Sequence, residues 1–255
     1  MDMKKIATIL LMALAALSAA AQGGEQLYNM SFDNWSKVKG EWCLWSEGAG
    51  SAKKVWGTAN RGLSILGKNC TEPEDEIVAV KGPGKRACKL HSEKVLWAFA
   101  AGNLYNGKFN KVLGTSGAEL SWGVPFHSRP KSLSGYYYYL PKTIDFAQKP
   151  YTHLKGKGDE GSVEVILADW DEPQVINTKE GKFVDVEKDP HIIGRGFIHI
   201  KKGTDGYVHF NLPIEYRNDR TPKWVVVLAC SSRYGGDFTG GNGSILYVDE
   251  FNFKY

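Results

Sequence analysis

The chain has 255 residues, 42% of them hydrophobic and 24% charged, so it is long enough and apolar enough to bury a sizeable core. Its formal net charge is +4, and its 32 lysine and arginine residues are spread among 28 acidic residues. Because there is no basic cluster of the kind that nucleic acids require, we expect no nucleic-acid partner.

The first 21 residues have the pattern of a secretory signal peptide. A pair of lysines precedes an apolar run at residues 6–17, and the small residues Ala19 and Ala21 fit a cleavage site before Gln22. The run is too short for a stable membrane span, and no cysteine follows it that could carry a lipid. We therefore expect an exported protein, periplasmic or extracellular, that is not inserted in a membrane after cleavage.

Residues 22–255 are expected to form one domain, because no Pro-rich or Ser-rich spacer, low-complexity tract or internal repeat divides them. The cysteines Cys43, Cys70, Cys88 and Cys230 allow several disulfide connectivities, and the sequence does not choose among them. Cys230 ends an apolar run and resembles a core residue, whereas Cys70 and Cys88 lie in polar stretches. If one disulfide forms, we expect it between those two.

Beyond the signal peptide, short runs rich in β-branched and aromatic residues recur between glycine-rich turns, and no long window has helical periodicity. Val163, Val165 and Leu167 share one strand face, which is typical of a half-buried strand. The segment 224–229 is apolar on both faces, which indicates a central strand. The strands expected in chain order span residues 94–101, 136–140, 162–170, 196–201, 207–213, 224–230 and 244–253.

A long loop at residues 231–243 closes with Asn242-Gly243, a turn signal that leads directly into the last expected strand. Strands in this number, without helices to cover a parallel sheet, need a second sheet to bury their apolar faces. The sequence therefore predicts an all-β fold, a two-sheet antiparallel β-sandwich of jelly-roll type.

The segment at residues 121–141, SWGVPFHSRPKSLSGYYYYLP, combines aromatic rings with an arginine between turn residues. An aromatic ring can lie against the C–H face of a sugar, and arginine supplies a fixed fork of donors. Since alternate strand residues point to opposite faces, only one alternating pair of the four tyrosines can line a single surface, and the other pair packs elsewhere. The candidate ligand-binding residues are Trp122, Phe126, Arg129, Tyr136, Tyr137, Tyr138, Tyr139, Tyr234 and Phe238.

Each of these candidates has a structural alternative. Pro130 holds Arg129 extended, so the guanidinium could orient a ligand or could brace its own loop. Tyr234 and Phe238 lie in a glycine-rich loop, where they could form the rim of a site or could fold back and anchor the loop.

Asp169 and Asp171 flank Trp170 at the end of an expected strand, so both carboxylates project to one side. Glycoside hydrolysis needs two carboxyl groups about 5 to 10 Å apart. Asp169 and Asp171 are therefore the candidate catalytic residues. The alternative is that both are ordinary solvated residues beside the turn that Pro173 ends.

Asp33 and Asp249 are candidate ligands for a structural calcium ion, because jelly-roll modules can hold one between their first and last strands with oxygen ligands. The alternative is a pair of hydrogen-bonded carboxylates near the termini, because the spacing of a calcium loop is absent. No other metal or cofactor is expected.

Five segments together resemble the PCMD family, whose name stands for putative carbohydrate metabolism domain. They are FDNW at residues 32–35, LYNGKF at 104–109, GVPFHSRPKSLSGYYYY at 123–139, PIEYR at 213–217 and SSRYGGDFTGGNGSILYVDEFNF at 231–253. The resemblance implies a jelly-roll sandwich similar to carbohydrate-binding modules, exported by Gram-negative gut bacteria that degrade polysaccharides. It carries no catalytic residues across to this chain.

The residues and the resemblance together predict an exported domain that binds a carbohydrate or polysaccharide, with the sugar held by aromatic stacking and an arginine. Two other functions stay open at this point. One is a glycoside hydrolase that uses a carboxylate pair, and the other is a structural or adhesion module that packs its tyrosines against a protein partner.

Overall fold

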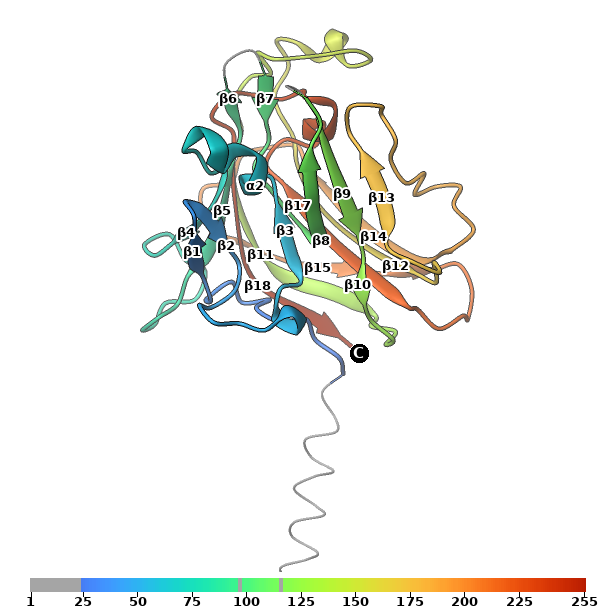
Figure 1. Cartoon of the computed structure of the whole chain (residues 1–255). Coiled ribbons are helices and arrows are strands. Elements are labelled where there is room, and N and C mark those ends of the chain that lie inside the picture. Colours follow the sequence, from blue (N-terminus) through green and yellow to red (C-terminus); the bar gives the residue numbers. More distant parts are fainter. Residues whose placement is uncertain (1–23, 96–97, 115–116) are drawn as a thin grey trace, which may run out of the picture.

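The computed structural model describes residues 24–95, 98–114 and 117–255, and it shows two packed layers of strands (Figure 1). The predicted signal peptide, residues 1–21, and the predicted first mature residue, Gln22, lie outside the described residues. Across the described ranges, no helix combines the length and apolar character needed to cross a membrane.

The larger sheet is antiparallel throughout and contains the strands that carry the candidate site. In spatial order its strands are β13 (Gln174–Asn177), β9 (Ala118–Trp122), β8 (Asn103–Val112), β17 (Trp224–Cys230), β12 (Gly161–Ala168), β14 (Ile192–Ile200) and β16 (Glu215–Tyr216). Two further strands pair with strands inside this sheet. β3 (Trp56–Thr58) pairs with β8, and β10 (Val124–Pro125) pairs with β17.

The smaller sheet lies behind the larger one in Figure 1 and is also antiparallel. Its strands in spatial order are β15 (Val208–Pro213), β11 (Ser132–Leu140), β18 (Ile245–Lys254), β5 (Ala87–His91) and β4 (Thr71–Glu74). The prediction of a two-sheet antiparallel sandwich of jelly-roll type is confirmed.

Short elements complete the chain. Two ribbons stand outside the sheets, β1 (Ser36–Val38) with β2 (Glu41–Cys43), and β6 (Glu93–Val95) with β7 (Ala98–Ala100). The helical elements are α2 (Asn60–Leu63) and the 3-10 turns η1 (Ser51–Lys53), η2 (Ser64–Leu66), η3 (Thr152–Leu154) and η4 (Gly235–Asp237).

The main core lies between the sheets and is built from alternate residues of their strands. Val163, Val165 and Leu167 of β12 all face it and are fully buried, as their spacing predicts. Ile166 and Val226 face the other side of the larger sheet, where they join a second buried cluster. Because β12 and β17 are covered on both faces, the prediction that the segment 224–229 is a central strand is confirmed.

The predicted strands differ from the observed ones mainly around residues 94–112. The expected strand at 94–101 is wrong, because β6 and β7 pair with each other antiparallel, with Lys94 opposite Phe99. The ten-residue strand β8 was not predicted, since Asn106-Gly107 reads as a turn. Instead, the Asn106 Oδ1 atom accepts a hydrogen bond from Val227 N at 2.7 Å, which ties the side chain into the sheet.

All four cysteines are buried thiols, so the conditional pairing of Cys70 with Cys88 is not formed. The register of the β4–β5 ladder explains this. Cys88 lies opposite Pro73, whereas the Cys70 carbonyl oxygen accepts a hydrogen bond from His91 N at 2.9 Å, at the far end of β5. Burial raises the pKa of the Cys70 and Cys230 thiols to about 12, so both are protonated at physiological pH.

Candidate functional site

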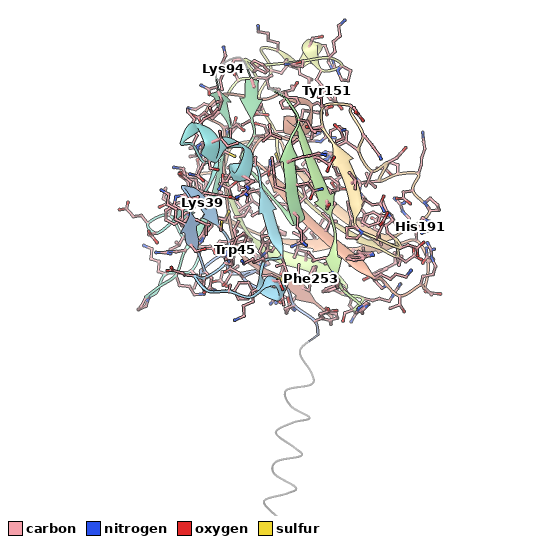
Figure 2. The ribbon with its side chains drawn as sticks, in the orientation of Figure 1. Lys39, Trp45, Lys94, Tyr151, His191 and Phe253 are labelled. Carbon is pink, nitrogen blue, oxygen red and sulfur yellow. The ribbon has the colours of Figure 1, made fainter. Side chains whose placement is uncertain are left out.

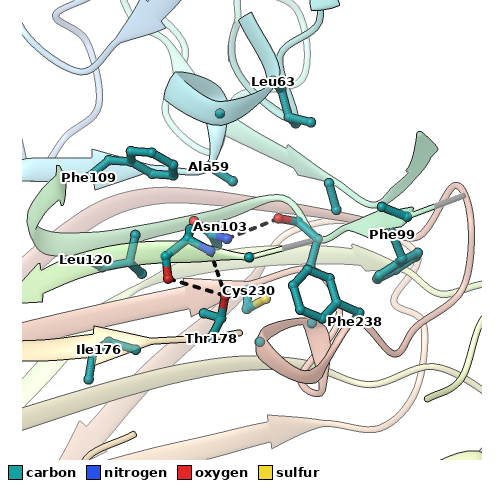
Figure 3. Close-up of a pocket in the computed structure, with 18 of the residues that line it drawn as sticks. Ala59, Leu63, Phe99, Asn103, Phe109, Leu120, Ile176, Thr178, Cys230 and Phe238 are labelled. Carbon is teal, nitrogen blue, oxygen red and sulfur yellow. Dashed lines mark hydrogen bonds between the residues drawn. The ribbon is translucent and has the colours of Figure 1, made fainter. Parts of the chain in front are cut away.

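A pocket with a volume of about 650 Å³ lies on the outer face of the larger sheet, away from the main core (Figure 3). The floor comes from β8, β17, β12, β9 and β13. The sides come from α2 and η2, from the β6–β7 ribbon, and from the loops that carry Phe183 and Phe238.

Strand alternation decides which side chains reach this floor. Leu104, Val227 and Ala229 point into the main core, so their neighbours along β8 and β17 must point outward. These outward residues include Tyr105 and Leu228, which lie opposite each other in the β8–β17 ladder. The pocket floor is therefore a direct consequence of the core packing on the other side of the same strands.

Aromatic and aliphatic side chains form most of the walls. Figure 3 shows Phe109 and Leu120 toward one end of the pocket and Phe99 and Phe238 toward the other. Leu63 of α2 lies above them in that view. Aromatic faces of this kind in a concave site are suited to stacking against the C–H surface of a ring-shaped ligand.

Three polar atoms on this apolar lining have no hydrogen-bond partner among the described residues. They are the Asn103 Oδ1 atom, the Tyr105 hydroxyl and the Trp122 indole Nε1. Tyr105 is 2% exposed, and burial raises the pKa of its phenol well above the usual range. A buried polar group without a partner costs about 1–3 kcal/mol. All three atoms are enclosed by protein in this structure, so a polar ligand group reaches them only when neighbouring side chains of the lining move.

Two charged side chains belong to the described part of the lining, Arg233 and Asp237. The Arg233 guanidinium is already engaged, because Nη1 lies 3.3 Å from Glu160 Oε2 and 2.8 Å from the Tyr234 hydroxyl. Burial raises the pKa of the Asp237 carboxyl. The pocket is thus aromatic and close to neutral, with one carboxyl at its edge.

Trp122 and Phe238 are the predicted ligand-binding residues that the structure brings together in this pocket. Trp122 comes from β9 and also packs against the outer cluster around Trp170. Tyr234 lies beside the pocket, where its ring is 4.5 Å from that of Tyr151 between centroids. The loop aromatics therefore combine both of the roles considered for them, since Phe238 lines the pocket and Tyr234 anchors its loop.

The four tyrosines divide between two faces, as strand alternation requires. Tyr137 and Tyr139 point toward the main core, and the Tyr139 hydroxyl donates to Ser231 O at 3.0 Å. Tyr136 and Tyr138 lie on the outer face of the smaller sheet. Tyr136 lines a second hollow there, of about 330 Å³, together with His209. Phe126 is fully buried in the main core and presents no surface to a ligand.

Arg129 lies against its own loop neighbours. Its guanidinium carbon is 4.0 Å from the centre of the Tyr216 ring, Nη2 donates to Asn218 O at 2.9 Å, and Nη1 donates to Arg220 O. These contacts match the loop-bracing alternative. The residue does not line either pocket.

The acidic pair lies elsewhere, and both members contact cations. The Asp169 carboxylate forms an ion pair with Arg220, whose Nη1 lies 2.7 Å from Oδ2, and its Oδ1 lies 3.1 Å from His191 Nδ1. Asp171 is almost fully exposed, and its hydrogen bond from Lys223 lowers the pKa of its carboxyl. In Figure 2 His191 lies at a different part of the molecule from Tyr151, the ring that contacts Tyr234.

The two calcium candidates are hydrogen-bonded carboxylates. Asp33 accepts from Lys85 Nζ at 3.0 Å and from Arg86 N at 2.9 Å, so an ammonium group already lies beside it. Asp249 is 1% exposed and accepts from Ala79 N at 2.8 Å, and burial raises the pKa of its carboxyl to about 7. Nowhere in the described ranges do three or more His, Cys, Asp or Glu side chains gather in a way that could hold a metal ion.

Sequence reasoning missed Asn103, Tyr105 and Phe109, although all three lie in or next to the LYNGKF segment. The signal that could have found them is the run of aromatic and β-compatible residues on both sides of Asn106-Gly107. Asn106-Gly107 is typical of a turn, so the sequence does not predict a strand across it. In the structure Gly107 has a positive φ of 146° and lies close to Ser121 O, and the strand continues through it.

Comparison with solved structures finds the same fold in proteins from Bacteroides species. A structure from Bacteroides thetaiotaomicron VPI-5482, described as a putative glycoside hydrolase, matches with a TM-score of 0.68 and 21% identity, over 92% of this chain and 72% of that chain. One from Bacteroides vulgatus ATCC 8482, described in the same words, matches with a TM-score of 0.66 and 18% identity, over 88% and 96%. A carbohydrate-binding module specific for non-crystalline cellulose, CBM28, matches with a TM-score of 0.38 and 13% identity, over 91% and 96%.

Among curated protein sequences there is no match. The PCMD family, described as "Putative carbohydrate metabolism domain", matches residues 31–254. That range includes both sheets of the sandwich and every strand that contributes to the pocket. The chain therefore belongs to the PCMD family.

Proposed function

We propose that this protein is an exported carbohydrate-binding domain whose sugar site is the pocket on the outer face of the larger sheet. The observation that carries the proposal is the combination of aromatic walls with unpartnered polar atoms at Asn103, Tyr105 and Trp122. A sugar has apolar C–H faces and hydroxyl groups at the ring edge, so it can satisfy both kinds of surface at once. Membership of a family named for carbohydrate metabolism supports the same ligand class.

Binding is favoured over hydrolysis by the charges in the pocket. Most glycoside hydrolases place two carboxyl groups on either side of the scissile bond. Among the described lining residues, Asp237 is the one carboxyl group. Asp169 and Asp171 do not line the pocket, and the hydrogen bond from Lys223 lowers the pKa of Asp171, which is opposite to the shift that a general acid needs.

A hydrolase is the second candidate, because two solved structures of the same fold are described as putative glycoside hydrolases. One feature of the pocket fits it. Burial raises the pKa of Asp237, which is the direction that a general acid requires. Sustained release of reducing ends from oligosaccharides, lost in Asp237→Asn, would establish this candidate in place of a binding domain.

The test of the binding proposal is retention on immobilised polysaccharides, measured by affinity electrophoresis. Trp122→Leu removes a lining ring and its indole N–H, so we expect retention to fall at least about tenfold. Tyr136→Leu is the matched control, since it removes a ring from the outer face of the smaller sheet. Unchanged retention of Trp122→Leu, or a loss confined to Tyr136→Leu, would show that the pocket is not the sugar site.

A further inference from the structure

The pocket lining also indicates which kind of sugar it suits, an inference that rests on the proposed function. Polar atoms that are free to bond a ligand are few. The Thr178 hydroxyl is engaged with Ala118, accepting from its N at 2.9 Å, and Arg233 is engaged with Glu160 and Tyr234. The described lining therefore presents mostly carbon to its ligand.

An unsubstituted sugar fits this lining poorly. Each of its ring residues carries several hydroxyl groups, and every hydroxyl placed against carbon loses its water without gaining a partner. The described lining side chains without a hydrogen-bond partner can serve only a few of them, namely the Ser162 hydroxyl, the Asp237 carboxyl and the three enclosed polar atoms. Trp122 Nε1 is a donor, Asn103 Oδ1 is an acceptor, and the Tyr105 hydroxyl can act as either.

The apolar surface also continues beyond the pocket onto its rim. Ile65 is 77% exposed and Leu66 51% exposed, and both line the pocket from the η2 turn. Phe183, 38% exposed, lies on another part of the lining. Exposed aliphatic residues of this size, gathered around one opening, mark a surface that buries apolar groups of a ligand.

The charges argue against an anionic glycan. A uronic acid or sulfated sugar needs a cation, yet the Arg233 guanidinium already contacts the Glu160 carboxylate 3.3 Å away. Asp237 would repel an anion when ionised. The ligand group that enters the pocket is therefore neutral.

We propose that the pocket binds a neutral glycan whose hydroxyl groups are partly O-acylated. Acylation replaces a hydroxyl that would lie unpaired against carbon by an ester whose alkyl or aryl part packs on the apolar wall and rim. The ester carbonyl only accepts hydrogen bonds, which suits Trp122 Nε1 and the Tyr105 hydroxyl, two donors that are enclosed in this structure and are reached when neighbouring side chains of the lining move. A remaining free hydroxyl donates to Asn103 Oδ1, which is why the acylation is partial.

Matched pairs of polysaccharides test this proposal. Acetylated xylan, acetylated glucomannan and acetylated galactan are each titrated into the purified protein by calorimetry, before and after saponification removes the esters from the same backbone. We expect an acetylated polymer to bind at least about tenfold more tightly than its saponified partner. Polygalacturonate is the anionic comparison and should not bind.

Variants at exposed positions locate the preference without disturbing the fold. The double change Ile65→Ser and Leu66→Ser should reduce the preference for the acetylated polymer several-fold, whereas Val208→Ser, an exposed position on β15, should leave it unchanged. Equal or tighter binding of the saponified polymers overturns the acyl preference while leaving carbohydrate binding intact. Failure of every polymer to bind in either form overturns both proposals, and a preference that survives in the double variant overturns the placement at this pocket.

Discussion

Tyr105 and Tyr139 are both buried tyrosines, but their hydroxyl groups have different roles. Both side chains are buried, and burial raises the pKa of both phenols well above the usual range, so both hydroxyls stay protonated. The Tyr139 hydroxyl donates to Ser231 O at 3.0 Å in the core. The Tyr105 hydroxyl has no partner within the described ranges and lines the pocket. The first hydroxyl stabilises the fold, and the second is an unsatisfied polar group enclosed beneath the pocket lining.

Removing each hydroxyl should therefore have opposite effects. Tyr105→Phe should leave the free energy of unfolding unchanged or slightly raised, and should weaken sugar binding about tenfold. Tyr139→Phe should lower the free energy of unfolding by about 1 kcal/mol and leave binding unchanged. Urea unfolding and calorimetric titration on the same preparations measure both effects, and a reversed pattern would contradict the assignment of the two hydroxyls.

Asp249 is a buried carboxyl on the smaller sheet, and its protonation makes the free energy of unfolding depend on pH. Its pKa is raised to about 7 in the folded protein by burial, while an unfolded aspartate titrates near 3.9. Between these values the folded protein holds a proton that the unfolded chain has released. The contribution of Asp249 to the free energy of unfolding therefore falls as the pH rises from about 4 to about 7.

Asp249→Asn removes this titration, so the variant should gain stability relative to the unchanged protein as the pH rises. Between about pH 4 and about pH 8, the free energy of unfolding of the variant should rise relative to that of the unchanged protein by about 4 kcal/mol at most. A hydrogen bond that the variant lacks at every pH shifts both ends of this comparison equally, so it does not change the sign. Urea unfolding at a series of pH values measures it. The exposed carboxyl variant Asp219→Asn is the control, and a pH-independent difference for Asp249→Asn would refute the account.

Some site residues could be predicted from the sequence and others could not. Phe238 was predicted because an aromatic residue in a glycine-rich loop lacks a local core, and Trp122 was predicted because it belongs to the aromatic and arginine segment at residues 121–141. Phe126 belongs to the same segment as Trp122 but fills the main core, where its neighbours are distant in sequence and include Phe253, 5.0 Å away between ring centroids. Arg129 likewise depends on Tyr216, a partner that no local pattern identifies.

At the element scale, β8 is the strand that organises the site. It pairs with β3 and β17 along its first half and with β9 along its second half. Local periodicity predicted β17 with the observed bounds, because a continuous apolar run needs no tertiary information. It could not predict β8, whose Asn106-Gly107 step is stabilised as strand by contacts with Val227 and Ser121 from distant parts of the chain.

Gly57 on β3 positions the Tyr105 ring, and replacing it should disturb the pocket. A Cβ atom at residue 57 would lie 2.6 Å from the Tyr105 Cε2 atom, so Gly57→Ala forces the ring to move. We expect weaker sugar binding and a loss of about 1–3 kcal/mol in the free energy of unfolding. Gly50→Ala is the matched control, since a Cβ there meets nothing within 4 Å. Equal behaviour of the two variants in titration and unfolding would contradict this role.

At the scale of the whole molecule, the sandwich leaves one face of each sheet for other contacts. The outer face of the larger sheet carries the aromatic pocket, and the outer face of the smaller sheet carries Tyr136, Tyr138 and the second hollow. Alternation along the strands predicted that the tyrosines divide between faces. It could not predict which outer face is the more hollowed, because the walls come from α2, the β6–β7 ribbon and loops remote in sequence.

Export is a prediction for the whole chain. Because residues 1–21 have the pattern of a cleaved signal peptide, the protein recovered from the periplasm or medium should begin at Gln22. N-terminal sequencing of cell fractions measures this. Recovery of residues 1–21 intact, or of a form integrated in the membrane, would contradict export by cleavage.

The most direct measurement of the central claim is a crystal structure of the protein with the oligosaccharide that binds most tightly. We expect a sugar in the pocket of the larger sheet, stacked on its aromatic walls and hydrogen-bonded to Asn103 Oδ1, the Tyr105 hydroxyl and Trp122 Nε1. A sugar bound instead against Tyr136 and His209 on the smaller sheet, with the large pocket unoccupied, would contradict it.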